Sequence, residues 1–125
     1  MDAIKWVHFH WGWYVLGLNA IAGIATLVTY WVKGARGRWT WILTGIAEVG
    51  MLVQIVLGVI LVTLSKDYQG NSRVQFHMFY GFVSFVTIGL LFAYRKSMRG
   101  RLELFYGLGG CFLAGLAIRA IMQVV

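Results

Sequence analysis

The sequence contains no proline, one cysteine and only four acidic residues among its 125 positions. Without proline, no helix loses a backbone N–H in its interior. With Cys111 alone, the chain forms no internal disulfide and no cysteine-rich metal site, and we interpret Cys111 as a small packing residue. Charged residues make up 12% of the chain, against about a quarter in soluble domains. These deficits argue against a soluble domain.

Hydrophobic residues, by contrast, make up 60% of the chain, more than one small soluble domain could bury. A membrane-spanning helix needs about 20 mostly apolar residues, and several segments meet that length. They predict one all-α membrane domain over residues 1–125, with spans at about 10–32, 39–64, 74–94 and 102–124. Because the turns are short, consecutive helices should be antiparallel neighbours in an up-down four-helix bundle. We expect no cleavable signal, because the apolar run from about Trp11 is too long for a signal core.

The basic residues are concentrated in the first and third connections between these spans, at Lys33, Arg36 and Arg38 and at Arg95, Lys96, Arg99 and Arg101. The positive-inside rule then predicts that these connections lie in the cytoplasm. Both termini would lie outside, in a multi-pass protein of the inner (plasma) membrane. The net charge of +7 is therefore interpreted as a topology signal. Nucleic-acid binding is not expected, since it requires a long accessible basic groove.

Several polar residues near the ends of the spans are predicted to share one layer close to the outer face, since their depths agree at about 1.5 Å per residue: His8, His10, His77, Arg119 and, slightly deeper, Gln54. Such residues are costly in lipid and usually face the bundle interior or a cavity.

Helical periodicity indicates which way these residues face, because positions i and i+4 share a face. Arg119 follows Gly107, Cys111 and Gly115 at this spacing, so we expect it to point inward along a small-residue contact stripe. Gln54 shares a face with Gly50 and Gly58, and His8 and His77 each stand one turn before a glycine. His8 is the better inward candidate if the first helix extends that far, but the choice between His8 and His10 stays open.

Two further polar residues, Asn19 and Glu48, fall near the midplane. We expect both to be buried. Glu48 would be either a neutral structural carboxyl, with Asn19 as its hydrogen-bond partner, or part of a proton path.

Two histidines on parallel helices beside an inward arginine suit a b-type haem, with one nitrogen of each imidazole on the iron. In this hypothesis His77 and either His8 or His10 are the ligands, Arg119 pairs with a propionate, and Gln54 lines the pocket. Alternatively, the three histidines bind copper or zinc, or the same layer holds a quinone. In a cofactor-free alternative, the histidines lie in the membrane interface and Arg119 reaches the headgroups.

The second span reads Gln54-Ile-Val-Leu57-Gly58 and is followed by a polar loop and a helix that begins near His77. This pattern resembles haem A synthase and related four-helix cytochrome modules over residues 53–81, under a third of the chain. The resemblance implies two histidine ligands on parallel helices at the outer side, with His77 as one and His8 or His10 as the other. The acidic Glu-x-x-Glu motif of that family is absent, so the resemblance implies no enzyme activity.

Together these patterns predict a small integral membrane subunit of a redox or energy-converting complex that carries one haem b near the outer face. The alternative is a cofactor-free accessory subunit whose glycine and aromatic surfaces dock larger membrane partners. No nucleophile–base pair, phosphate-binding loop or paired carboxylates stand in the sequence, so we expect no catalysis by the chain alone.

Overall fold

A computed structural model describes residues 2–64 and 70–124 of the chain. The described residues form long α-helices and one short 3-10 turn: α1 (Asp2–Trp31), η1 (Lys33–Ala35), α2 (Arg38–Leu64), α3 (Ser72–Ala93) and α4 (Leu102–Val124). All four α-helices are long and apolar enough to cross a membrane. This confirms the prediction of an all-helical, multi-pass membrane protein. Lys66 and Asp67 of the middle connection lie outside the described residues.

The start of the first helix differs from its predicted position. The apolar pattern indicates a span from about His10, whereas α1 begins at Asp2. No glycine or proline stands before Gly12, so nothing in this stretch interrupts helical hydrogen bonding. The other boundaries lie within two residues of their predicted positions. At α3, the side chain of Asn71 accepts a hydrogen bond from the Arg73 amide at 2.9 Å and caps the helix start.

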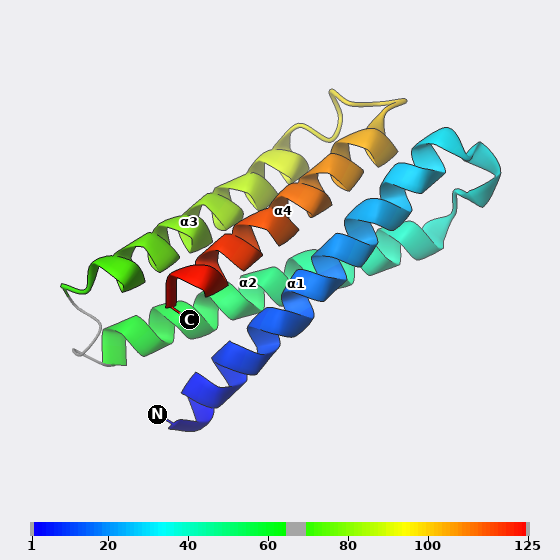
Figure 1. The fold of residues 1–125 in the computed structure, drawn as a ribbon. Coiled ribbons are helices and arrows are strands. Elements are labelled where there is room, and N and C mark those ends of the chain that lie inside the picture. Colours follow the sequence, from blue (N-terminus) through cyan, green and yellow to red (C-terminus); the bar gives the residue numbers. More distant parts are fainter. Residues whose placement is uncertain (1, 65–69, 125) are drawn as a thin grey trace.

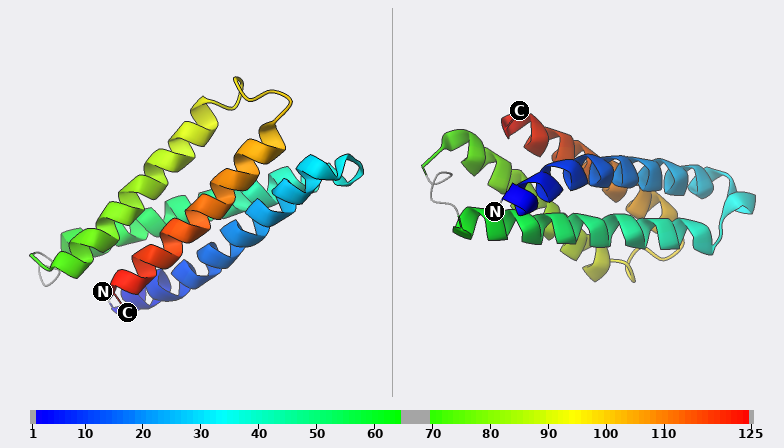
Figure 2. Two further views of the ribbon diagram at one scale, coloured as in Figure 1. Left: turned by 45° about the horizontal axis from the view of Figure 1, so that its top comes forward. Right: turned by 90° about the horizontal axis from the view of Figure 1, so that it is seen from below.

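Helix α4 lies between α1 and α3, and α2 packs mainly against α1 (Figures 1 and 2). The α1–α2 and α3–α4 connections lie at one end of the molecule, and both chain termini lie at the other (Figure 1). Among neighbouring pairs, α2 and α3 touch least. The bundle is therefore tightest along α1, α4 and α3 and loosest along the seam between α2 and α3.

Glycines bring the backbones of α1 and α4 into direct contact. A Cβ atom added at Gly23 would lie 2.6 Å from the Cys111 amide nitrogen, and one at Gly110 would lie 2.9 Å from the Gly23 Cα. A Cβ at Gly107 would lie 2.6 Å from the Leu27 Cγ. Small residues at such crossings allow close van der Waals packing, which drives helix association in lipid.

The buried apolar core draws on all four helices: Val15, Met51, Ile88, Leu91, Leu113 and Leu116. Several polar side chains also lie inside and donate hydrogen bonds to backbone oxygens. Thr26 donates to the Ala22 carbonyl at 2.7 Å. The Trp11 indole donates to the Gly50 carbonyl at 3.0 Å and so joins α1 to α2. The interior thus combines apolar packing with hydrogen-bonded polar groups, as the absence of water requires.

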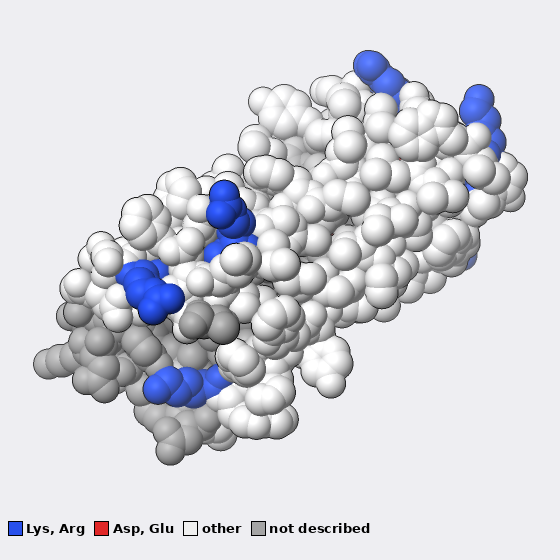
Figure 3. Space-filling view, viewed as in Figure 1, with Lys and Arg blue, Asp and Glu red and all other residues white. Residues whose placement is uncertain are grey.

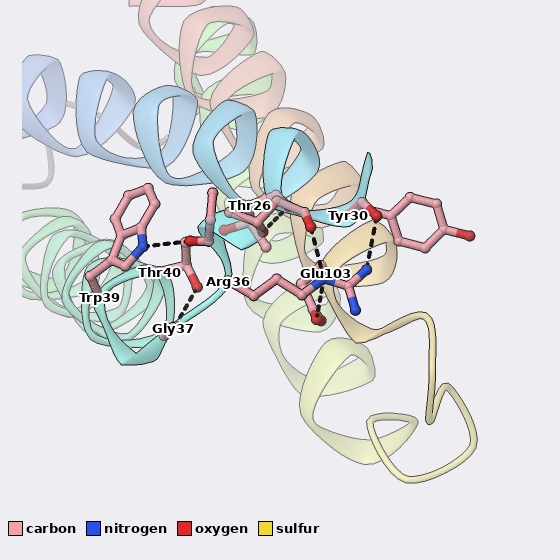
Figure 4. Close-up of polar contacts among 9 residues, drawn as sticks. Thr26, Tyr30, Arg36, Gly37, Trp39, Thr40 and Glu103 are labelled. Atoms are coloured by element: carbon pink, nitrogen blue, oxygen red, sulfur yellow. Dashed lines mark hydrogen bonds and ion pairs between the residues drawn. The ribbon is translucent and has the colours of Figure 1, made fainter. Parts of the chain in front are cut away.

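At the end that carries the two basic connections, Arg36 ties the first turn to two helices (Figure 4). Its guanidinium donates to the Thr29 carbonyl at 2.7 Å and to the Tyr30 carbonyl at 2.8 Å. These are carbonyls of the last turn of α1, which have no partner within the helix. The same guanidinium lies 3.3 Å from the Glu103 carboxylate at the start of α4. Arg36 therefore caps α1 and links it to α4.

Large apolar side chains are exposed along the whole length of every helix, including Trp31, Ile42, Phe82 and Phe112. On the face drawn in Figure 3, lysine and arginine lie toward the two ends, and a broad band between them carries other residues. Such a surface fits hydrocarbon in the middle and headgroups or water at the ends.

Candidate functional site

Two of the three histidines meet inside the end of the molecule that carries the termini. His8 on α1 and His77 on α3 have ring centroids 5.9 Å apart, with the ring planes at 81°. Both side chains are partly buried. They meet because α1 continues to Asp2 and so carries His8 beside α3.

His10 lies elsewhere, on the exposed face of α1. Its ring stacks on Trp6 with centroids 4.2 Å apart, and its Nδ1 lies 2.9 Å from the Trp6 carbonyl oxygen. Residues that are two positions apart in an α-helix, such as His8 and His10, point about 200° away from each other. Only one of the two histidines can therefore face inward. The structure thus decides the choice that the sequence left open, in favour of His8.

The His77 ring is held by α4. Its Nδ1 lies 2.7 Å from the Ala120 carbonyl oxygen. A carbonyl only accepts hydrogen bonds, so Nδ1 is the donor, and in the neutral imidazole the lone pair then lies on Nε2. This is the arrangement by which proteins orient a metal-binding imidazole.

Gln54 supports His8 from α2. Its Nε2 donates to the His8 carbonyl oxygen at 2.6 Å. Two glycines make room for this contact: a Cβ at Gly12 would lie 2.9 Å from the Gln54 Nε2, and one at Gly58 would lie 3.1 Å from the His8 Cε1. The glycines one turn from His8 and from Gln54 therefore accommodate these side chains. The hydrogen bond from Gln54 to the His8 backbone was not predicted from the sequence, although the Gln54–Gly58 spacing was a usable signal.

Two polar atoms of this cluster have no hydrogen-bond partner. They are the Nδ1 of His8 and the Oε1 of Gln54, and both atoms are buried. An unsatisfied buried polar atom costs about 1–3 kcal/mol. These two atoms belong to neighbouring side chains, and an imidazole N–H and an amide oxygen can serve as partners for each other.

The predicted inward orientation of Arg119 is wrong, because this residue is exposed. The i+4 stripe that suggested it does not stay on one face: each step of four residues overshoots a full turn by about 40°. Three steps from Gly107 therefore place Arg119 well around the helix. Gly107 is buried, whereas Gly115 is exposed with nothing within 4 Å of an added Cβ.

The alternative of a three-histidine copper or zinc site is also wrong for the described chain. His10 faces away from the other two histidines. Over residues 2–64 and 70–124, no three His, Cys, Asp or Glu side chains are grouped to hold a metal ion.

The midplane residues do not form the expected pair. Asn19, which is 1% exposed, donates to the Val15 carbonyl at 2.9 Å and to the Ala47 carbonyl at 3.2 Å. The Asn19 amide therefore links α1 to α2 by a hydrogen bond and is not bonded to Glu48. Glu48 is only half-buried and lines a groove beside α3. The expectation of a fully buried Glu48 is corrected accordingly.

The geometry brings together His8, His77 and Gln54 and leaves out His10 and Arg119. A bare zinc ion is held by three or four protein side chains, and only two imidazoles meet here. Two imidazoles suit a metal group whose other ligands are not protein side chains. The chain matches no protein family, no curated protein and no solved structure with which it was compared.

Proposed function

We propose that this chain is a small subunit of a redox or energy-converting complex in the inner (plasma) membrane, and that it holds one haem b between His8 and His77. In this proposal the chain is an up-down four-helix bundle with both ends outside the cytoplasm. The observation that carries the proposal is the approach of the two imidazoles to 5.9 Å between ring centroids.

That separation is compatible with two imidazoles sharing one metal. A metal–nitrogen bond is about 2 Å long, so two rings that both bind one ion would have centroids no farther apart than roughly 6 Å. His8 and His77 would each give one imidazole nitrogen to the haem iron. The absence of a third ligand side chain from the described residues argues against a bare ion but not against haem.

The protein residues would orient and protect the group. The Ala120 carbonyl accepts a hydrogen bond from the His77 Nδ1 and so orients the ring. Gln54 donates a hydrogen bond to the His8 backbone carbonyl and so holds that part of α1. The His8 Nδ1 has no hydrogen-bond partner, which is compatible with a ring that binds a ligand. When bound, haem supplies one-electron transfer.

The side of the membrane follows from charge. His8 and His77 lie near the starts of α1 and α3, whereas the two connections rich in lysine and arginine follow the ends of these helices and lie at the opposite end of the molecule. The positive-inside rule favours the cytoplasm for these connections. The histidine pair, near the termini, would then face the outer side.

Absorption spectroscopy tests the haem. The protein, purified in detergent with haemin supplied, should show a Soret band and sharper reduced bands after dithionite. His8→Ala and His77→Ala should each abolish the six-coordinate spectrum, whereas His10→Ala should retain it because His10 is outside the site. A folded wild-type protein whose spectrum with haemin is the same as that of haemin in detergent alone would contradict the proposal.

A second candidate function is a cofactor-free accessory subunit. It is favoured by glycines with open space around them: nothing lies within 4 Å of a Cβ added at Gly17 or Gly115. Unfilled small-residue positions on membrane helices are typical docking points for other helices. This candidate predicts a colourless protein that co-purifies with larger membrane subunits, and that loses them on Gly115→Leu.

A further inference from the structure

The loosest seam of the bundle, between α2 and α3, carries a continuous groove. Two hollows of about 460 Å³ and about 400 Å³ open along it, and both are lined by Gly45 and Glu48 of α2. One hollow extends between α2 and α3, and the other extends to the α3–α4 connection and the start of α4. The groove thus runs from the middle of the molecule to its basic end.

The two parts of the groove differ in chemistry. The part nearer the middle of the molecule is an open groove on the surface, walled by apolar side chains that include Leu52, Phe85, Ile88 and Phe92. The mouth is lined by three basic residues of the α3–α4 connection, Arg95, Lys96 and Arg99. An apolar groove that ends among basic side chains matches a molecule with a hydrocarbon chain and an anionic headgroup.

Arg95 is held close to the groove. Its Nη1 donates to the Phe92 carbonyl at 2.6 Å, and its guanidinium carbon lies 3.8 Å from the centroid of the Phe92 ring. The side chain therefore folds back along α3, over a residue that itself lines the groove. This fixes one positive charge at the junction between the apolar wall and the mouth.

We propose that this groove binds one anionic phospholipid, with an acyl chain between α2 and α3 and the phosphate at Arg95, Lys96 and Arg99. Hydrocarbon contact alone selects nothing in a bilayer, because every lipid offers it. Selection therefore comes from charge. Three cations against the one carboxyl of Glu48 leave the groove positive whether or not Glu48 is ionised. Basic pockets between membrane helices bind phosphate headgroups on this principle.

Native mass spectrometry of the whole chain tests the proposal. The protein would be incubated in detergent with equal amounts of phosphatidylglycerol and phosphatidylcholine that have identical acyl chains. Each Lys or Arg near a phosphate contributes a factor of about five, so the wild type with its three cations should retain one phosphatidylglycerol with about a hundredfold preference. Arg95→Gln combined with Arg99→Gln should therefore lower the preference about twenty-fivefold, while Lys33→Gln combined with Arg38→Gln in the other connection should leave it unchanged.

Filling the groove provides the second arm. Nothing lies within 4 Å of a Cβ added at Gly89 or Gly45, which line the groove, or at Gly115, which does not. Gly89→Leu should abolish lipid retention and Gly115→Leu should preserve it, with circular dichroism and gel filtration reporting the fold. If Gly89→Leu fails to fold, Gly45→Leu serves the same purpose. Equal retention of both lipids, unchanged retention in a folded groove-filling variant, or a polypeptide in place of the lipid overturns the proposal.

Discussion

Among single residues, Gly58 illustrates how closely the histidine site depends on small side chains. A Cβ at this position would lie 3.1 Å from the His8 Cε1, closer than ordinary van der Waals contact. The histidine ring must shift to accept it. Displacement of a ligand that depends on its surroundings typically costs tenfold or more in affinity for the metal group.

We therefore expect Gly58→Ala to weaken haem binding about tenfold, measured by titrating the folded protein with haemin. Gly81→Ala is the matched control, since nothing lies within 4 Å of its added Cβ although it stands one turn from His77. Equal weakening in both variants would show that contact with His8 is not the cause.

Asn19 permits a second test at this scale. Asn19→Leu keeps the branched shape and the number of side-chain heavy atoms but removes the donor to the Ala47 carbonyl of α2. Interhelical hydrogen bonds in membranes contribute about 0.6–2 kcal/mol, so the free energy of unfolding in mixed micelles should fall by that amount. Thr63→Val should be nearly neutral, because Thr63 is exposed and bonds only within its own helix. An unchanged free energy of unfolding in Asn19→Leu would mean that the hydrogen bond from Asn19 to the Ala47 carbonyl does not contribute to stability.

At the scale of elements, the contact between α1 and α4 should limit the stability of the bundle. Gly23→Ala places a Cβ 2.6 Å from the Cys111 amide nitrogen, a backbone atom that cannot move without displacing α4. Overpacking of this kind costs about 1–3 kcal/mol. Equilibrium unfolding in SDS should show this loss for Gly23→Ala and almost none for Gly17→Ala, one of the open positions on the same helix. Comparable losses in the two variants would indicate a helix-propensity effect rather than overpacking.

Helix positions were predictable from the sequence to a much greater degree than helix faces. Long apolar runs mark each span, because only a helix satisfies its backbone in lipid. The start of α1 was missed because the first residues mix charged, aromatic and aliphatic side chains and show no clear apolar run, although none of them breaks a helix. This error left His8 and His10 undecided. Arg119 was misplaced because a face defined by i+4 spacing rotates along a long helix, and the path of that face depends on how α4 crosses α1.

The candidate site shows the same limit. The histidines and Gln54 could be chosen from their depth, since depth follows from counting residues. The anchor on the Ala120 carbonyl could not be predicted, because it is a backbone atom and depends on the rotation of α3 against α4. The groove beside Glu48 also lay beyond the sequence, since it exists only because α2 packs mainly on α1 and leaves α3 open.

For the whole molecule, the distribution of charge makes a topology prediction. In a Cys111→Ser background, a cysteine introduced by Ala3→Cys should react with a membrane-impermeant maleimide in intact cells whose outer face is accessible. Gly34→Cys, in the turn between α1 and α2, should react only after the membrane is permeabilised. The opposite labelling pattern would place the histidine pair on the cytoplasmic side and would refute the proposed orientation.

The central position of α4 has a consequence for the order in which the protein is assembled. Helix α1 emerges from the ribosome first, yet its most extensive partner is α4, which is synthesised after the other three helices. The hairpin of α1 and α2 must therefore reside in the bilayer with the surface around Gly23 uncovered until α4 is inserted. The imidazole of His77 likewise gains its hydrogen-bond partner only when Ala120 of α4 has been synthesised, so in the proposed function haem loading would follow the insertion of α4.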